Sequence, residues 1–443
     1  MLRAVTPVSR QFIFVFLIYV KILHLNTYAG NGGAGKACLR LSKALQKQGI
    51  HSEVAVNFLF MKNPEVHYLS KGFFFKWLTA AGILFERLAN KIFVKHLPIP
   101  FSIPLWGKDI SGTKLLRSAD LIHIHWINHA FLRPEDISKL LRLNKPVVWT
   151  FHDSNAFTGG CHVRYTCDLY ERECGNCPVL RNSHPGDLSH RIWKQKNRAY
   201  QNTDFTIVAP SKWMAESVSR SKLLQTKPLV NIPNTLDTEI FKPLSKAECR
   251  TILGLSPDKF IMMSGFMPSR KDLHKGTSYL IEGLEIVARE HQLEIENIEL
   301  VIFGNRDTSN VPDFPVKTTF LGTIATEERL ALCYNAADVF LAPSLEDNLP
   351  YTVLESLACG TPVVAFTTGG IPDMVEHKIN GYLAEHRSSA DLAQGISWVF
   401  KNPQKELLRS NARAHVIAYF SENVIANRHV EMYKSLLVDH VSA

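Results

Sequence analysis

Short runs rich in valine and isoleucine alternate with helical stretches from residue 20 onward, and the alternation restarts after Asp237. This order is typical of βαβ units, in which helices connect parallel strands. The first half predicts strands at Lys21–Leu25, Ser52–Val56, Leu121–His125, Pro146–Phe151 and Phe205–Ala209. The second half predicts strands at Phe260–Ser264, Glu299–Phe303, Thr319–Leu321, Val339–Ala342 and Pro362–Phe366. Two separate doubly wound α/β sheets fit this pattern better than one sheet.

The length of 443 residues allows two or three domains, at roughly 100–200 residues each. Segment 231–245 contains Pro233 and Pro243 and has no strong periodicity, so we interpret it as a hinge. We therefore predict an N-terminal domain at residues 20–240 and a C-terminal domain at residues 241–420. The amphipathic stretch 421–443 is expected to form a helix that crosses back to the first domain.

The first 19 residues do not fit this pattern. Residues 12–20 are uniformly apolar, but they lack the small-residue cleavage site of a signal peptide and fall far short of the ~20 residues that span a bilayer. We expect residues 1–19 to be an extension of an ordered domain that starts near Val20. One hypothesis is that Val20 is the true initiator, read from a GTG codon, and the intact mass of the native protein tests it.

The chain carries 50 Lys and Arg residues against 41 Asp and Glu, which gives a net charge of +9. This mild excess suits an anionic small molecule or a membrane surface, and it is too dilute to indicate nucleic acid. Residues 71–106 are rich in aromatic side chains interleaved with Lys and Arg. Such a stretch can form a cationic amphipathic helix in a lipid interface, from which we predict peripheral attachment to an anionic bilayer. A helix packed in the core of the first domain is the alternative.

A glycine-rich loop follows the first predicted strand. Gly30, Gly32 and Gly35 satisfy G-x-G-x-x-G between a strand and a helix, so a dehydrogenase that binds a nicotinamide cofactor must be considered. That fingerprint requires an acid at the carboxyl end of the second strand, whereas Glu53 lies at its start. The loop can still bring a helix N-terminus and free amides to an anion or a sugar. A tight packing turn is the alternative interpretation.

Segment 343–375 holds the densest group of candidate site residues. A strand ends at Ala342, and a polar loop containing Asp347 and Asn348 follows it. Pro350 fits the first residue of a helix, because its fixed φ suits that position, and Gly360 fits the end of the same helix. The loop amides and the helix dipole are therefore expected to face a phosphate or a sugar.

These residues also resemble a known family. Asp347-x7-Glu355, followed by ACGTPVV and GGIPD, resembles the E-x7-E signature of retaining glycosyltransferases of family 4, which have the GT-B fold. The resemblance covers almost everything after residue 20, including KILHLNTY, PVVWTFHD, APS, PNTLD and HKG. With its TGGC…C…CGNCP insertion, the chain is most similar to exopolysaccharide-, capsule- and colanic-acid-type sugar transferases. The resemblance implies two Rossmann-like domains that face a central cleft, with the C-terminal helix returning to the first domain.

The resemblance also implies roles for individual residues. Glu355 would bind the nucleotide ribose, and Asp347 would hold the donor sugar. Lys275, in HKG, would neutralise the diphosphate, with Arg270 as a candidate second cation. His152, at the end of a predicted strand, would contact the acceptor hydroxyl. The other implied donor-binding positions are Gly33, Gly265, Asn348, Leu349, Pro350 and Tyr351.

Two residues depart from the family pattern. Asp347 stands where the family has its first Glu, and Phe266 follows Gly265 where the family often has Arg. Because of these departures, a GT-B-like binding or scaffold subunit without turnover remains an alternative, beside the less favoured NAD-dependent dehydrogenase.

Histidines and cysteines raise the question of metal binding. His123 and His125 are two apart on a strand and share one face, but the sequence shows no third ligand, which favours packing in the site with Trp126. Cys38 and three other scattered cysteines are interpreted as core residues. Four further cysteines, in an insertion at residues 159–180, are candidates for a structural zinc site, with free or packed thiols as the alternative. They are Cys161, Cys167, Cys174 and Cys177.

We therefore expect a bacterial retaining glycosyltransferase that moves a sugar from a nucleoside-diphosphate sugar to a glycan or lipid-linked acceptor in surface polysaccharide synthesis. The resemblance implies no catalytic metal, and we expect no nucleic acid partner. A cytosolic donor favours reduced thiols and a cytoplasmic location, with attachment to the inner face of the membrane.

Overall fold

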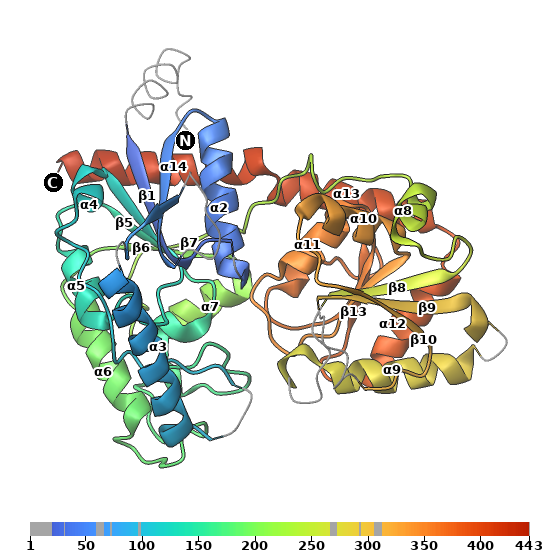
Figure 1. Ribbon diagram of the computed structural model, residues 1–443, viewed down its shortest axis with the longest axis horizontal. Helices are drawn as coiled ribbons and strands as arrows, with labels where there is room; N and C mark the ends of the chain where they lie inside the picture. The colour runs from blue at the N-terminus through green and yellow to red at the C-terminus, as the bar shows by residue number, and fades with distance from the viewer. Residues whose placement is uncertain are drawn as a thin grey trace, which may run out of the picture. The chain divides into compact units, whose positions relative to one another are not determined.

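The computed structural model describes residues 20–30, 32–58, 66–70, 73–95, 99–265, 273–291, 294–304 and 312–442. They form two compact units, each built on one parallel sheet (Figure 1). The first unit extends to Thr235 and also includes the chain from Ile425 onward, and the second runs from Leu236 to Val424. The expected extension at residues 1–19, Phe266 and Arg270 lie outside the described residues.

The first sheet has seven described strands, all parallel, in the order β3-β2-β1-β4-β5-β6-β7. They are β1 (Lys21–Tyr28), β2 (His51–Phe58), β3 (Val66–Tyr68), β4 (Leu121–Ile124), β5 (Val147–Thr150), β6 (Thr206–Ala209) and β7 (Leu229–Asn231). The strand order reverses between β1 and β4. Open α/β sheets bind ligands beyond the carboxyl ends of the strands at such a point, so this edge of the sheet positions the candidate site.

The helices of the first unit pack on this sheet or on one another. They are α2 (Gly32–Lys47), α3 (Phe73–Phe93), α4 (Lys114–Ser118), α5 (Pro134–Leu141), α6 (Leu188–Tyr200) and α7 (Lys212–Arg220). The last helix, α14 (Glu422–Ser442), belongs to this unit from Ile425 onward. Its Tyr433 hydroxyl lies 2.6 Å from Nδ1 of His123 on β4, which fixes the helix against the middle of the sheet.

The second sheet has six described strands, also parallel, in the order β10-β9-β8-β11-β12-β13. They are β8 (Phe260–Gly265), β9 (Ile298–Phe303), β10 (Lys317–Gly322), β11 (Val339–Ala342), β12 (Val363–Phe366) and β13 (Gly381–Ala384). Its helices are α8 (Lys246–Leu253), α9 (Thr277–Glu290), α10 (Glu327–Ala336), α11 (Tyr351–Ala358), α12 (Ser389–Lys401) and α13 (Lys405–Phe420). Figure 1 shows α9 and α12 on one side of this sheet and α10, α11 and α13 on the other. The strand order reverses between β8 and β11.

The prediction of two doubly wound α/β sheets is confirmed, and all ten predicted strands are present with ends shifted by up to three residues. Three short strands were not predicted, namely β3, β7 and β13. Each is the outermost strand at an edge of its sheet, where a strand needs no continuous apolar run. Pro350 is the N-cap of α11 rather than its first helical residue, because its ψ of 123° is extended although its φ of −67° suits a helix.

Candidate active site

In the second unit, Lys275 and Asp347 come together although they are 72 residues apart in the chain. Lys275 ends the short 3₁₀ helix η3 (Leu273–Lys275), and Asp347 lies in the loop between β11 and α11. Lys275 Nζ lies 3.4 Å from Asp347 Oδ2, with side chains 35% and 22% exposed. A cation and a carboxylate thus stand together, both reachable by solvent, at the carboxyl end of the sheet.

Close backbone contacts fix the loop that carries Asp347. Gly276 has a φ of +65°, and a Cβ there would lie 1.9 Å from the carbonyl oxygen of Pro343. The Gly370 amide donates a hydrogen bond of 3.0 Å to the Asp347 carbonyl. The loop is therefore held on both sides by segments that leave no room for larger residues.

Glu355 lies on α11 and is buried. Its Oε2 accepts a hydrogen bond of 2.8 Å from the Tyr334 hydroxyl. Burial, and then the neighbouring Glu355 carboxylate, raise the pKa of Tyr334 well above its usual value, so the phenol keeps its proton and donates. Tyr334 thereby orients the carboxylate of Glu355. The sequence carried no signal for this partner.

The other expected donor-binding residues of the second unit differ in how deeply they are buried. Asn348, Leu349 and Tyr351 are buried, and Pro350 is half-buried at the start of α11. Gly265 ends β8, where a Cβ would lie 2.4 Å from a ring carbon of Phe303, so packing alone demands a glycine at this position.

The glycine loop of the first unit connects β1 to α2. Gly30 and Gly32 have φ values of +73° and +72°, and a Cβ at Gly35 would lie 3.1 Å from the Tyr28 carbonyl oxygen. At Gly33 a Cβ would meet nothing within 4 Å, so packing does not require this glycine. Within its described residues, which end at Phe58, the carboxyl end of β2 has no acid, and Glu53 at the start of the strand pairs with Lys21 at 2.9 Å. The loop therefore lacks the ribose-binding acid of a dehydrogenase.

A cavity of about 450 Å³ opens beside this loop. The residues that line it are Asn26, Tyr28, Gly32, Gly33, Ala34, Gly35, Trp126, His152 and Asp153. The rings of Tyr28 and Trp126 stack with their centroids 5.8 Å apart. Aromatic faces beside glycine amides and a carboxylate are suited to a sugar, which has both apolar C–H faces and hydroxyls.

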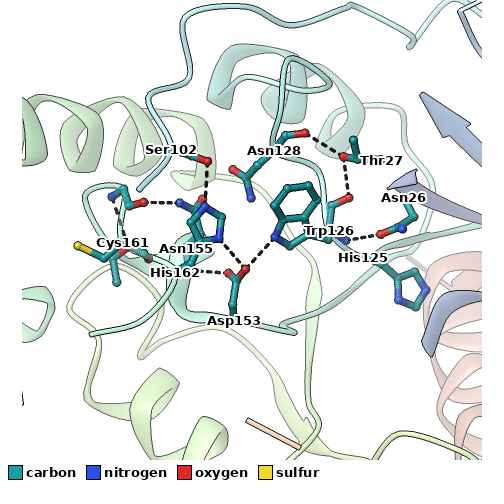
Figure 2. Close-up of polar contacts among 12 residues, drawn as sticks. Asn26, Thr27, Ser102, His125, Trp126, Asn128, Asp153, Asn155, Cys161 and His162 are labelled. Atoms are coloured by element: carbon teal, nitrogen blue, oxygen red, sulfur yellow. Dashed lines mark hydrogen bonds and ion pairs between the residues drawn. The ribbon is translucent and has the colours of Figure 1, made fainter. Parts of the chain in front are cut away.

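Asp153 fixes the wall of this cavity. Figure 2 shows the Trp126 indole and the His162 ring both directed at its carboxylate, with Nε1 of Trp126 and Nδ1 of His162 at 2.7 and 2.6 Å from Oδ2. Burial alone would raise the pKa of Asp153, but His162, the Asn155 amide and Trp126 together hold it below the usual value. Asp153 is thus an anchored carboxylate. The WTFHD motif pointed to it, whereas nothing in the sequence indicated His162.

A second cavity, of about 610 Å³, shares Trp126 and Asp153 with the first. Its other side is formed by the end of α3 and the segment after it, including Lys91, Lys95 and Phe101. Two isolated antiparallel bridges, Val94 with Leu180 and Phe101 with Cys161, join that segment to the cysteine-rich insertion. The insertion therefore supports one wall of this cavity.

His152 belongs to a row of hydrogen-bonded imidazoles. Its Nε2 lies 3.0 Å from Nδ1 of His125, and Nε2 of His125 lies 3.0 Å from Nδ1 of His24. Burial lowers the pKa of His152 to about 4, although Asp153 opposes this shift. His152 is therefore neutral at neutral pH and lines the sugar-sized cavity with an uncharged ring.

The four clustered cysteines lie close enough to act electrostatically on one another. All four are free thiols within the described part of the chain, and no three of their sulfurs lie within 4.8 Å of one another. Cys174 Sγ accepts a 3.2 Å hydrogen bond from the Gly159 amide, and Cys161 bonds to Cys177, which lowers the pKa of Cys177 to about 7. Two of the four sulfurs are thus each other's partner, and the structural zinc expected at these four cysteines stays a prediction.

Helix α3 exposes several large apolar side chains. Its inward-facing residues are small or polar, namely Thr79, Gly82, Glu86 and Ala89. Its exposed side chains include Trp77, Leu84, Phe85, Leu88, Ile92 and Phe93, together with Lys76, Arg87 and Lys91. Of the two interpretations, packing in the core is seen at Ala89, whereas these larger side chains are exposed. Within the described residues, no helix has both the length and the hydropathy needed to cross a bilayer.

Comparison with known families gives two matches that together cover most of the chain. Residues 31–240 match the family described as Glycosyltransferase Family 4, and residues 259–402 match the one described as Glycosyl transferases group 1. An uncharacterized glycosyltransferase of Methanocaldococcus jannaschii is 24% identical over 363 residues, which are 77% of this chain and 89% of the relative. Other curated relatives match over 21% to 59% of their own length.

Solved structures share the fold over nearly the whole chain. Sucrose-phosphate synthase from Thermosynechococcus elongatus aligns with a TM-score of 0.63 at 20% identity, over 95% of this chain and 100% of that one. Anabaena HepE in complex with UDP-glucose aligns with a TM-score of 0.60 at 18% identity, over 94% of this chain and 99% of that one. At these identities the likeness shows the fold alone, which is GT-B.

Proposed function

Because the chain is a glycosyltransferase of the family 4 type with the GT-B fold, we propose that it moves a sugar from a nucleoside diphosphate to a glycan or lipid-linked acceptor. The observation that carries this proposal is the contact of Lys275 with Asp347 in a tightly held loop. An ammonium beside this loop suits a departing diphosphate, and the carboxylate suits a sugar hydroxyl. In this scheme Glu355, oriented by Tyr334, binds the ribose.

The reaction that we propose retains the anomeric configuration. The acceptor attacks from the side that the diphosphate leaves, and the leaving phosphate takes the acceptor's proton. Lys275 and the amides that precede α11 stabilise the charge that develops on the diphosphate, so the scheme needs no protein nucleophile. The neutral His152 contacts the acceptor hydroxyl without competing for its proton.

We assign the acceptor to the first unit. The cavity beside the glycine loop accommodates one sugar on Trp126 and Tyr28, with Asp153 as a fixed hydrogen-bond acceptor. The larger neighbouring cavity, with Lys91 and Lys95, suits the anionic and apolar continuation of a lipid-linked acceptor. HepE, whose solved structure holds UDP-glucose, supports a uridine nucleotide as the first donor to try.

We further propose that α3 attaches the enzyme to an anionic bilayer at the inner face of the cytoplasmic membrane. Its exposed apolar side chains and its cations are the two components of an interfacial helix. A surface polysaccharide assembled on a lipid carrier would present its acceptor at this interface.

The experiment is an assay of the full chain with UDP-, GDP- and dTDP-sugars, scored by donor hydrolysis and by thermal shift. We expect one donor class to be hydrolysed slowly and to stabilise the protein. Glu355→Gln should weaken donor binding while the protein stays folded, because the amide can still accept the hydrogen bond of Tyr334. Donor binding without turnover in the presence of acceptor extracts would instead favour the scaffold alternative, and binding of a nicotinamide cofactor would favour the dehydrogenase.

A further inference from the structure

Three potential metal ligands meet in the core of the first unit, away from the clustered cysteines. His24 lies on β1, Cys38 on α2, and His125 directly after β4. One ring nitrogen of each histidine and the sulfur of Cys38 lie within 4.8 Å of one another. All three side chains are buried, with 0%, 1% and 2% exposure. Two imidazoles and a thiol are a ligand set that binds zinc.

One ring nitrogen of His24 lacks a hydrogen-bond partner in the part of the chain that the structure describes. Nδ1 of His24 is bonded to His125, whereas Nε2 of His24 is buried and has no hydrogen-bond partner among the described residues. A buried ring nitrogen without a partner is unfavourable whether or not it carries a proton. A metal ion bound through Nε2 of His24 would satisfy this lone pair.

We propose that His24, Cys38 and His125 form a structural binding site for one Zn²⁺ ion. When the ion binds, the thiol of Cys38 loses its proton to solvent. If the facing nitrogens of the two histidines are the ligands, the proton that they share leaves to solvent as well. A cavity of about 10 Å³ borders His125 and has about the space of one water molecule, which suits a fourth ligand. This proposal does not depend on the proposed function.

The required movement is small. Zn–N bonds of about 2.0 Å and a Zn–S bond of about 2.3 Å in a tetrahedron place ligand atoms about 3.3–3.8 Å apart. The present separations, all within 4.8 Å, need changes of about 1.5 Å or less, which side-chain rotation supplies.

The surroundings of the site match those of metal-bound histidines. Nδ1 of His125 lies 3.0 Å from Nε2 of His152, and a ligating histidine usually makes such a bond with its second nitrogen. His123, which shares the strand face of His125, is excluded because its two nitrogens contact Tyr433 and Thr150 at 2.6 and 2.7 Å. The site therefore takes its third ligand from a helix rather than from the neighbouring histidine.

The ion would join the elements on both sides of the glycine loop. β1 precedes this loop, and α2 begins within it, so a metal held by His24 and Cys38 clamps its two ends. His125 connects the clamp to the end of β4. The expected consequence is a more stable first unit.

The test uses the full chain, freed of metal by a chelator under reducing conditions and then titrated with Co²⁺ and with Zn²⁺. We expect the wild type to bind one Co²⁺ with a thiolate charge-transfer band and tetrahedral d–d bands. Cys38→Ala should bind one ion fewer. The matched control Cys333→Ala, a buried cysteine of the second unit, should bind as the wild type does. Zn²⁺ at a hundred times its Kd should raise the unfolding temperature by about 5–10 °C in the wild type but not in Cys38→Ala.

Several results would overturn the proposal. One is a wild type that shows no tetrahedral thiolate spectrum with Co²⁺. Another is equal metal content in the wild type and Cys38→Ala. Loss of the ion in Cys161→Ala, but not in Cys38→Ala, would place the metal in the cysteine-rich insertion instead. If Cys38→Ala does not fold, His24→Gln replaces it, and the wild-type spectrum alone still decides whether a thiolate ligates the ion.

Discussion

The ammonium group of Lys275 lies 3.4 Å from the carboxylate of Asp347, at the carboxyl edge of the second sheet. Both side chains are partly exposed, so their attraction is screened by water and adds little to folding stability. The contact therefore leaves two charged groups side by side and open to solvent.

Lys275→Ala should lower kcat/KM for sugar transfer by about 10²–10³-fold, because it removes the cation proposed for the developing diphosphate charge. The unfolding free energy should change by less than about 0.5 kcal/mol, since the lost ion pair is partly exposed. The exposed Lys401→Ala is the control and should leave both quantities unchanged. Transfer by Lys275→Ala at a rate within twofold of the wild type would remove Lys275 from the site.

Gly276→Ala should destabilise the second unit by about 3 kcal/mol or more, because the added methyl would collide with the Pro343 carbonyl that the loop places against it. Gly254 is a matched control with a φ of +66° and nothing within 4 Å of an added Cβ. Gly254→Ala should cost only about 1 kcal/mol for its left-handed backbone. Urea unfolding measures the difference, and equal losses would show that the contact at Pro343 relaxes freely.

Stability of the first unit should fall as the pH is lowered from about 6.5 to 4. Burial lowers the pKa of His24 from 6.5 to about 3 and those of His152 and His429 from 6.5 to about 4. Below pH 6.5 the unfolded chain binds protons that these folded residues do not, so each can remove up to about 1.4 kcal/mol per pH unit. Above pH 6.5 both states are neutral and the stabilisation is fully present.

Urea unfolding at pH 7.5, 6.0 and 5.0 measures this slope. His429→Gln should make the fall in unfolding free energy with decreasing pH smaller by about 1.4 kcal/mol per pH unit or less, the contribution of one buried histidine. A free energy of unfolding that stays constant from pH 7.5 to 5.0 would contradict the prediction.

The double variant Phe85→Ser with Ile92→Ser should lose binding to anionic vesicles at low salt, because both side chains belong to the exposed apolar face of α3. Its unfolding free energy should stay close to that of the wild type, since neither residue is in the core. Ile252→Ser, an equally exposed apolar residue on α8 of the second unit, is the matched control. Flotation with vesicles measures binding, and a wild type that does not float at low salt would refute membrane attachment.

The sequence was sufficient for features that depend on local pattern. Ten strands were predicted from the alternation of apolar runs with helical stretches, whereas the short outermost strands β3, β7 and β13 were missed. Within the site, motifs pointed to Lys275, Asp347 and Glu355, but only packing shows that Lys275 meets Asp347 and that Tyr334 meets Glu355.

Other features depend on register and could not be predicted. The pairing of His24 with His123 on adjacent strands brings His24 to His125, and no sequence pattern fixes the register of β1 against β4. The sequence of α3 likewise predicted a helix but not which face of it is buried, because the buried residues are small or polar rather than large and apolar. The convergence of His24, Cys38 and His125 therefore became visible only in three dimensions.

The two bridges that join residues 94 and 101 to the cysteine-rich insertion have an evolutionary consequence. They lie outside the seven-stranded sheet, so insertions or exchanges in this wall leave every strand of the Rossmann-like core in register. A chimera that receives residues 159–180 from a relative would therefore gain a new wall for this cavity while the sheet of the first unit stays unchanged.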